Sequence, residues 1–259
     1  MRQKPPQGLR PNCLLTRYPI CFVHGLKNIF AAFDYWNRVP EYLSSHGYEV
    51  HVFKGPWRGP HEKRLKSFSS QFREVLERHP KVHVIAHSLG ALDMLDLLGM
   101  EEFIGRFASV TFVSPPFGGS PFAHLGLLFG EKLFQSTNET LTVESATNIV
   151  KRFTAPKDVL VGTIISRPRQ YPLSHSLRTH HRILTSYLRG KNLNSENDGL
   201  VPLDSQRIAK SLGRVFFEFP GDHVQVIGRG PWPKSAKTAH GMFLDHAIFL
   251  AEYDFQTAQ

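Results

Sequence analysis

The chain has 259 residues, of which 41% are hydrophobic and 20% are charged. This composition is ordinary for a globular protein and excludes a largely disordered chain. Lys and Arg number 31 against 22 Asp and Glu, a formal net charge of +9 that favours anionic partners. Because no nucleic-acid-binding motif accompanies the charge, we expect no nucleic-acid partner. A weak association with anionic membrane or lipid surfaces is the alternative to an inert basic surface.

The beginning of the sequence shows no apolar stretch of the kind found in signal peptides. No run approaches the 18 or more apolar residues of a membrane-spanning helix. We therefore expect a cytoplasmic protein, with secretion without a cleaved leader as the alternative. Residues 1–17 are rich in Pro and Arg and lack periodicity, which predicts a flexible arm before a single domain at 18–259. Two cysteines, Cys13 and Cys21, are too few for a disulfide framework.

Apolar residues recur with helical and strand-like spacing in alternation along the chain. In chain order this predicts a strand at 20–23, a helix at 33–46, a strand at 48–53, a helix at 62–78, a strand at 82–86, a helix at 91–98, a strand at 109–114, a helix at 142–153, strands at 158–165 and 214–219, and a helix at 241–253. Such alternation predicts an α/β fold with a mainly parallel central sheet flanked by helices. Ligand sites in such folds lie at the carboxyl ends of the strands.

Residues 117–143 interrupt this rhythm with an apolar, glycine-rich stretch. An insertion at the carboxyl edge of the sheet is a candidate for a short lid or for the wall of an acyl pocket. An ordinary packed helix and loop is the alternative. The large apolar side chains that we expect to line a substrate pocket here are Phe117, Phe122, Leu125, Leu128 and Phe129.

The strongest chemical signal is Ala86-His-Ser-Leu-Gly90, which follows a strand and precedes a helix. This context matches the nucleophile elbow of α/β-hydrolases, normally Gly-x-Ser-x-Gly. The turn is so tight that the residues two before and two after the serine must be small, as Ala86 and Gly90 are. We therefore predict that Ser88 is a catalytic nucleophile in an α/β-hydrolase fold.

A serine hydroxyl needs a general base, and that base needs an orienting acid. In this fold the acid and then the histidine follow the serine along the chain. Asp198, in a polar turn, and His223, directly after the last strand, satisfy this order. Five other histidines are weaker candidates for the base, because they lie on a rigid helix, next to the serine or before the acid: His246, His87, His175, His180 and His181. Asp222 and Glu218 are weak rivals for the acid.

The negative oxygen of a tetrahedral intermediate requires N–H donors held in place. The backbone N–H of Leu89, directly after the nucleophile, is one candidate donor. The turn His24-Gly25-Leu26 after the first strand supplies the other, with Leu26 as the expected donor. Gly25 allows the backbone to approach the substrate closely. An ordinary β-turn is the alternative for this segment.

Several segments together resemble the true bacterial triacylglycerol lipases of the Pseudomonas/Proteus type. They are Tyr18–Leu26, Asp34–Trp36, Pro40–Leu43, His46–Val50, Ala86–Gly90, Ser114–Phe122 and Asn197–Pro202. The resemblance covers most of residues 17–122 and returns at 197–225. It implies a triad of Ser88, Asp198 and His223, with Leu26 and Leu89 as oxyanion donors, in agreement with the assignment from the residues.

Three departures from that family pattern matter. The resemblance implies a structural calcium held by an aspartate two residues after the catalytic histidine, but Gln225 stands there, and the basic stretch 180–189 offers no second ligand. Calcium needs several anionic oxygen ligands, so we predict no metal, and we expect no cofactor. The lid region is shorter than in the family, and Ala86 replaces the first glycine of the elbow.

These features predict a serine hydrolase of carboxylic esters, similar to a triacylglycerol lipase or carboxylesterase, working through an acyl-enzyme on Ser88. A phospholipase or lipid acyltransferase using the same acyl-enzyme is the alternative activity. A catalytically inactive binding protein of the same fold is the alternative of another class. The presence of Ser, Asp and His candidates in the required order argues against that alternative.

Overall fold

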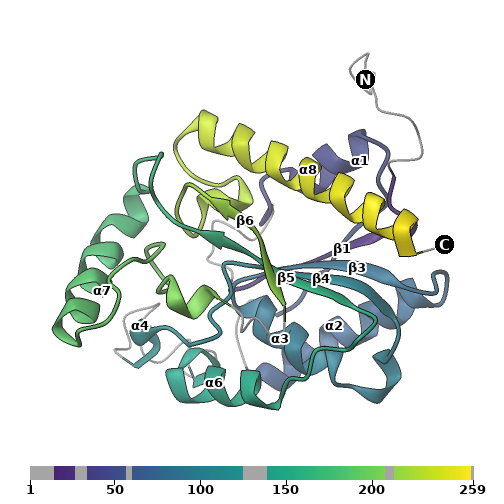
Figure 1. The fold of residues 1–259 in the computed structure, drawn as a ribbon, viewed down its shortest axis with the longest axis horizontal. Coiled ribbons are helices and arrows are strands. Elements are labelled where there is room, and N and C mark those ends of the chain that lie inside the picture. The colour runs from purple at the N-terminus through teal and green to yellow at the C-terminus, as the bar shows by residue number, and fades with distance from the viewer. Residues whose placement is uncertain (1–14, 27–33, 57–59, 125–138, 208–212, 258–259) are drawn as a thin grey trace.

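The structure of the protein is a computed structural model that describes residues 15–26, 34–56, 60–124, 139–207 and 213–257. Six parallel strands form one sheet in the order β2-β1-β3-β4-β5-β6 (Figure 1). The strands are β1 (Ile20–Val23), β2 (Val50–Val52), β3 (Val82–His87), β4 (Phe107–Val113), β5 (Leu160–Ser166) and β6 (Arg214–Phe219). β1, β3 and β4 are completely buried, which explains why their sequences are mostly apolar. Three buried polar side chains in β3 and β4, His83, Ser109 and Thr111, have hydrogen-bond partners.

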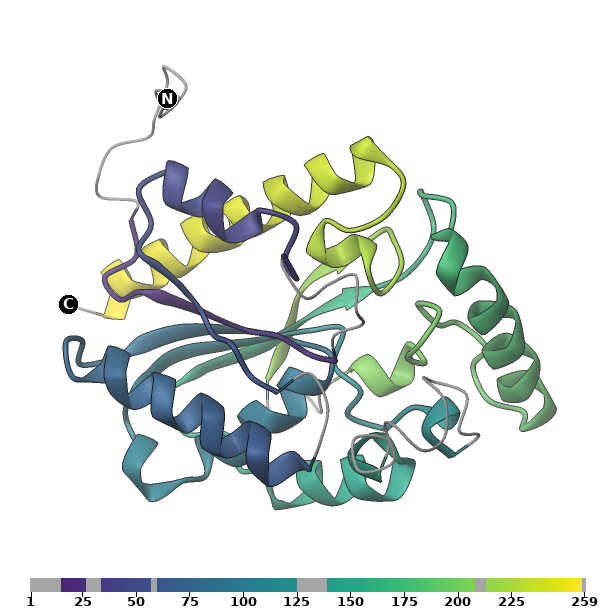
Figure 2. The same cartoon turned by 180° about the vertical axis from the view of Figure 1, so that it is seen from behind.

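Helices cover both faces of the sheet, as the alternating pattern predicts. The helices are α1 (Val39–Ser45), α2 (His61–Leu76), α3 (Leu89–Leu98), α4 (Pro121–His124), α6 (Val143–Arg152), α7 (Arg178–Gly190) and α8 (Pro233–Thr257). α2, α3 and α6 lie on one face, and α1 and α8 lie on the other (Figures 1 and 2). α7 stands apart from both layers, beyond one end of the sheet (Figure 1).

Each face of the sheet buries its own hydrophobic cluster. Phe68 and Phe72 of α2 pack with Leu92 of α3 against one face. On the other face, Trp36 packs edge-on against Phe22 of β1 and Phe243 of α8. The two clusters hold the strands rigidly from both sides, so the loops at the strand ends are presented from a fixed frame. No helix in the described parts of the chain is long and apolar enough to cross a membrane.

The sequence pattern predicts these elements well, with four main differences. α1 begins at Val39 and not at the expected 33, because residues 35–38 form turns in which Asn37 and Arg38 have positive φ. β2 is shorter than expected because the Tyr48 N–H bonds to the Leu43 carbonyl oxygen at the end of α1 rather than to a strand. α8 begins at Pro233, before the expected 241. α7 was not predicted, because it buries only a narrow stripe through Leu184 and Leu188 on an otherwise polar helix.

Both described ends of the 117–143 insertion are anchored. The Ser120 N–H donates to the Leu141 carbonyl oxygen, and the Phe117 N–H donates to that of Ser205. The middle of the insertion, including the expected pocket residues Leu125, Leu128 and Phe129, lies outside the described residues. A lid in this position therefore stays a prediction.

Candidate active site

Ser88 occupies a strained turn between β3 and α3. Its φ of 56° and ψ of −126° lie in a region that residues with a side chain seldom adopt. The turn is closely packed, since a Cβ added to Gly90 would lie 2.8 Å from the His24 carbonyl oxygen. Ala86 is fully buried in the strand, so its methyl group is accommodated. This geometry is that of a nucleophile elbow, which presents the serine hydroxyl above the carboxyl end of the sheet.

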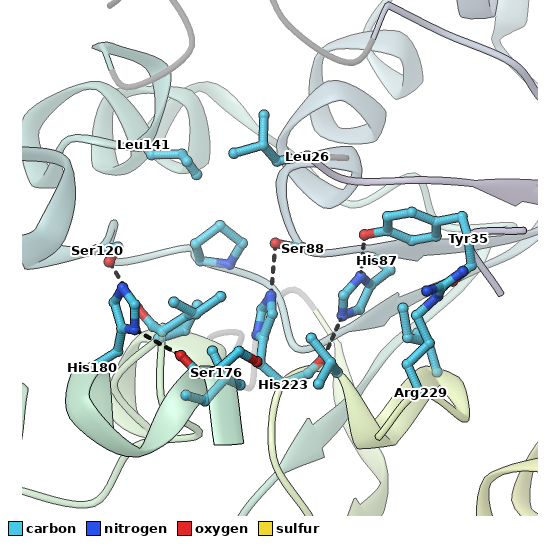
Figure 3. Close-up of a pocket in the computed structure, with 16 residues that line it drawn as sticks. Leu26, Tyr35, His87, Ser88, Ser120, Leu141, Ser176, His180, His223 and Arg229 are labelled. Carbon is cyan, nitrogen blue, oxygen red and sulfur yellow. Dashed lines mark hydrogen bonds between the residues drawn. The ribbon is translucent and has the colours of Figure 1, made fainter. Parts of the chain in front are cut away.

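The structure brings Ser88, His223 and Asp198 together from three separate loops. His223 Nε2 lies 2.9 Å from Ser88 Oγ, and His223 Nδ1 lies 2.7 Å from Asp198 Oδ2 (Figure 3). The His223 backbone N–H also donates to the Asp198 carbonyl oxygen at 3.0 Å, which holds the two loops in register. With Nδ1–H donated to the carboxylate, Nε2 is free to accept the serine proton, as a general base must.

Asp198 is fully buried, and its carboxylate is surrounded by donors. Oδ1 accepts the backbone N–H groups of Leu200 at 3.0 Å and Val201 at 2.8 Å. Oδ2 accepts the hydroxyl of Ser166 at 2.7 Å and the side-chain amide of Gln206 at 3.0 Å, in addition to the imidazole. Because buried polar groups need hydrogen-bond partners, these donors hold the Asp198 side chain in place beside His223.

A second hydrogen-bonded chain joins the loop after β1 to the catalytic histidine. The hydroxyl of Tyr35 accepts the Gly25 N–H at 3.1 Å and lies 2.6 Å from His87 Nδ1. His87 Nε2 lies 3.1 Å from the carbonyl oxygen of His223, so this nitrogen carries the proton and donates it. Burial lowers the pKa of His87 well below its ordinary value, and the neighbouring imidazole of His223 lowers it further. A neutral His87 therefore accepts a hydrogen bond from the Tyr35 hydroxyl at Nδ1.

The turn after β1 lies against the elbow. A Cβ added to Gly25 would lie 2.8 Å from Ser88 Cβ, so only glycine fits there. Leu26 lines the same cavity as Ser88 and lies on the opposite side of it from His223 (Figure 3). Leu89 is the first residue of α3, and its backbone N–H has no acceptor within the helix. The two residues expected to donate, Leu26 and Leu89, thus lie near Ser88, and their role as oxyanion donors stays a prediction.

A buried ion pair holds this turn from below. Arg64 of α2 donates to the His24 carbonyl oxygen at 2.8 Å and makes two hydrogen bonds, of 2.6 and 2.9 Å, to Asp93 Oδ2 on α3. Burial alone would raise the pKa of Asp93, but the Arg64 charge and the contacts from His61 and Arg64 hold it below its ordinary value. The ion pair therefore fixes the turn after β1 to the helix that follows Ser88.

A cavity of about 220 Å³ opens above Ser88. The residues that line it are Leu26, Tyr35, His87, Ser88, Pro116, Ser120, Leu141, Ser176, Leu177, His180, Leu200, Val201, His223, Val224, Ile227 and Arg229. Half of these side chains are aliphatic, and the polar ones include Ser88 and His223. Such a cavity suits an apolar chain joined to one polar reacting group.

Two expected pocket residues lie elsewhere. Phe117 packs edge-on against Phe112 of β4 in the core, with ring centroids 5.1 Å apart. Phe122 is also buried, and it packs edge-on against His180, which itself lines the cavity. Neither phenylalanine is among the cavity-lining residues, because each side chain is taken up by core packing. Phe122 supports the cavity wall instead of forming it.

Gln225 stands where the resemblance implies a calcium-binding aspartate, and its side chain is hydrogen-bonded within the protein. The buried side chain of Gln225 accepts the Asp222 N–H at 2.9 Å and donates to the Pro172 carbonyl oxygen at 2.8 Å. Asp222 in turn accepts backbone N–H groups from Ser174 and Gln225. Burial raises the pKa of Asp222. The loop after β6 is therefore braced by Gln225, Asp222 and backbone groups where the resemblance implies an ion.

The rival candidates of the sequence analysis have other partners. His246 is fully buried and lies 2.7 Å from the Thr111 hydroxyl, and burial lowers its pKa to about 3. Glu218 pairs with Arg167 at 3.4 Å. Sequence reasoning missed the roles of Ser166, Gln206 and Tyr35, since only folding brings them within reach of the catalytic groups. No sequence spacing could have indicated them.

Comparisons with known proteins agree with this geometry. The model of the alpha/beta hydrolase family matches residues 22–251, whereas no curated protein matches the chain. Staphylococcus hyicus lipase is structurally similar at 15% identity, with a TM-score of 0.75 over 96% of this chain and 99% of that one. The mature lipase BlEst2 of Bacillus licheniformis is 16% identical, with a TM-score of 0.69 over 92% of this chain and 94% of that one.

A metagenomic carboxyl esterase, MGS0156, is 18% identical, with a TM-score of 0.69 over 92% of this chain and 75% of its own. At these identities the solved structures support the fold alone. The family model covers most of the chain and includes the elbow, the acid and the histidine. The chain therefore belongs to the alpha/beta hydrolase family.

Proposed function

We propose that the protein is a serine hydrolase that cleaves carboxylic esters of lipids through an acyl-enzyme on Ser88. The observation that carries this proposal is the hydrogen-bonded chain from Ser88 Oγ through His223 to Asp198, with distances of 2.9 and 2.7 Å. A serine in a strained turn, next to a base that is already oriented, has the arrangement that nucleophilic catalysis requires. Because these hydrogen bonds between Ser88, His223 and Asp198 are all present, they also argue against an inactive binding protein.

In the proposed mechanism, Ser88 Oγ attacks the ester carbonyl carbon while His223 Nε2 takes the serine proton. Asp198 stabilises the imidazolium through Nδ1 without itself becoming protonated. The backbone N–H groups of Leu26 and Leu89 donate to the negative oxygen of the tetrahedral intermediate. His223 then gives its proton to the departing alcohol, and a water molecule, activated in the same way, releases the acid from Ser88.

The aliphatic walls of the cavity favour an acyl chain as the part of the substrate that enters it. The structural neighbours include two lipases and a carboxyl esterase, which supports an ester substrate without naming it. The narrower resemblance to triacylglycerol lipases of the Pseudomonas/Proteus type stays part of the proposal. We infer from the side chains alone that no calcium is needed, because Gln225 already braces the loop after β6.

The surface beside the cavity supports a lipid partner. α7 supplies His180 to the cavity wall and carries no acidic residue. The exposed cations Arg178, Arg182 and Arg189 form no ion pair within the described parts of the chain. Ile183, 40% exposed on the same helix, adds an apolar contact. A basic and partly apolar helix that contributes one residue to the cavity wall favours an anionic lipid surface, and it keeps a phospholipase as the second candidate.

The proposal is tested with a series of nitrophenyl esters of increasing chain length, assayed on wild type and on Ser88→Ala. We expect the variant to lose at least about a thousandfold in kcat, the scale for removing a nucleophile. A fluorophosphonate probe should label Ser88 in the wild type only. Retained hydrolysis in the variant, or no labelling of the folded wild type, would contradict the proposal. Phospholipids and glycerides compared side by side then separate the two lipid substrates.

A further inference from the structure

A cluster of metal-binding side chains lies at the opposite end of the sheet from Ser88. Glu49 directly precedes β2, His51 lies within β2, and His79 follows the end of α2. The Nε2 atoms of both histidines lie 3.0 Å from the same atom, Glu49 Oε1. All strands are parallel, and Ser88 follows the carboxyl end of β3. A residue that precedes β2 therefore lies at the amino ends of the strands, on the opposite side of the sheet from Ser88.

The backbone explains why these three side chains converge. Residues two apart on an extended strand point to the same face, which places Glu49 beside His51. β2 is an edge strand, so nothing in the sheet covers its outer side. His79 reaches the same place from the turn between α2 and β3, and its ring meets that of His51 at 62°.

The three side chains are accessible to solvent, and their ligand atoms already lie close together. The side chain of Glu49 is 54% exposed, and those of His51 and His79 are 25% and 22% exposed. The ligand atoms of the three residues all lie within 4.8 Å of one another. Among the described residues, no other group of three His, Cys, Asp or Glu side chains brings its ligand atoms this close. A hydrated ion can therefore reach a set of ligands that is already assembled.

We propose that Glu49, His51 and His79 form a site for a divalent transition metal ion, and that zinc fits it best. Two imidazoles and one carboxylate are a ligand set that zinc uses, with water in the fourth position. Zinc bonds of about 2.0–2.1 Å in a tetrahedral arrangement require ligand atoms roughly 3.3 Å apart. The observed distances of 3.0 Å to Glu49 Oε1 need only a small outward movement of exposed side chains. Calcium and magnesium prefer six or more oxygen ligands and do not fit.

The bound ion would act on stability and not on catalysis. It would connect β2, an edge strand of three residues, to the turn that leads into β3. Metal that binds only the folded protein stabilises it by an amount that grows with the logarithm of the metal concentration relative to Kd. Since histidine must be unprotonated to bind, the affinity should fall as the solution becomes more acidic. The ion would leave the triad unaffected, because it binds near the amino ends of the strands, whereas Ser88 lies at their carboxyl ends.

The test is calorimetric titration of the untagged protein with zinc chloride, together with thermal unfolding. We expect one saturable site and a rise in Tm of about 5–10 °C at a hundredfold excess over Kd. His51→Ala and Glu49→Gln should each weaken zinc binding by at least about tenfold, the lower end of what disturbing a metal site costs. Cobalt bound in place of zinc should show the visible absorption of a tetrahedral ion.

His175→Ala, which removes an exposed histidine outside the cluster, is the matched control and should bind zinc as the wild type does. Circular dichroism checks that every variant is folded, and Glu49→Gln keeps the shape of the side chain should His51→Ala fail to fold. Absence of saturable binding would overturn the proposal. So would zinc affinity that is the same in the wild type and in both cluster variants. Ester hydrolysis by the metal-free variants should equal that of the wild type, which separates this test from that of the active site.

Discussion

At the residue level, Ser88 depends on neighbours that hold it in an unfavourable conformation. Backbone strain of this kind costs about 1–3 kcal/mol and persists only where the surroundings enforce it. The Ser88 N–H donates to the Val113 carbonyl oxygen at 2.9 Å, and Gly90 is packed against the turn after β1. The same contacts that enforce the strain also place the turn after β1, so Ser88 and the oxyanion donors that we propose are positioned together.

Tyr35 is the residue whose role is least visible in the sequence. Its hydroxyl connects the Gly25 N–H of the oxyanion turn to His87, and His87 connects to the backbone of His223. Burial raises the pKa of Tyr35, which keeps the hydroxyl protonated and able to donate. We therefore regard Tyr35 as a positioning residue that acts on both the oxyanion turn and the base.

Replacing Tyr35 with Phe should lower kcat for ester hydrolysis by about tenfold and change KM less than about twofold. The variant leaves the Gly25 N–H without an acceptor and His87 without a donor, each a buried loss of about 1–3 kcal/mol. Steady-state kinetics with one nitrophenyl ester measures the effect, and Tyr253→Phe on α8 is the control. A variant with a lowered Tm but unchanged kcat would show that Tyr35 is only structural.

At the element level, α2 and α3 are joined by charges at the end that lies near the oxyanion turn. His61 Nδ1 lies 3.0 Å from Asp93 Oδ1, and His61 Nε2 lies 2.7 Å from Asp96 Oδ2. Burial alone would lower the pKa of His61, but the two carboxylates raise it to about 9. With Arg64 on the other oxygen of Asp93, two cations hold both helices together.

This contact predicts a loss of stability in alkaline solution. A histidine whose folded pKa is about 9 against an ordinary value of 6.5 contributes stability that is complete below pH 6.5. That contribution, of about 3 kcal/mol at most, disappears as the pH rises through 9. Urea unfolding at pH 7 and pH 10 gives the free energy of unfolding at each pH. The difference between the two values should be smaller in His61→Gln than in the wild type. An equal pH dependence in the variant and the wild type would contradict the ion pair.

At the level of the whole molecule, the net charge of +9 is distributed unevenly. Several cations are already neutralised, such as Arg64 by Asp93 and Arg73 by Glu102. Arg178, Arg182 and Arg189 of α7 form no ion pair within the described residues. α7 therefore exposes part of the surplus positive charge, on the face of the helix turned away from its buried residues Leu184 and Leu188.

We expect the protein to bind vesicles that contain phosphatidylserine and to release them as salt is raised, because the attraction is screened. The double variant Arg182→Glu/Arg189→Glu should lower the vesicle affinity by at least about tenfold, since each basic residue contributes about 1 kcal/mol near such a surface. Lys63→Glu/Lys66→Glu on α2 makes the same change in net charge elsewhere. Vesicle sedimentation compares them, and equal losses in both double variants would show that only the total charge matters.

The sequence by itself determined the alternating fold and the chain order of Ser88, Asp198 and His223. Both are local signals, because periodicity reports which faces are buried and the elbow needs small residues at fixed spacing. It also indicated the turn at Gly25, where a side chain would collide with Ser88. The fold prediction is confirmed, and the structure brings the three side chains together. Their catalytic roles stay a prediction. These signals are readable because each physical constraint acts within a few residues of the position that reveals it.

The tertiary structure alone decided which groups surround the triad. Ser166 and Gln206 reach Asp198 from distant parts of the chain, and Tyr35 reaches His87 across 52 positions. Phe117, expected in the pocket, turned into the core instead, because hydrophobicity predicts burial without saying against what. Contacts between residues far apart in sequence depend on the packing of the whole sheet and its helices, and no local pattern of residues encodes them.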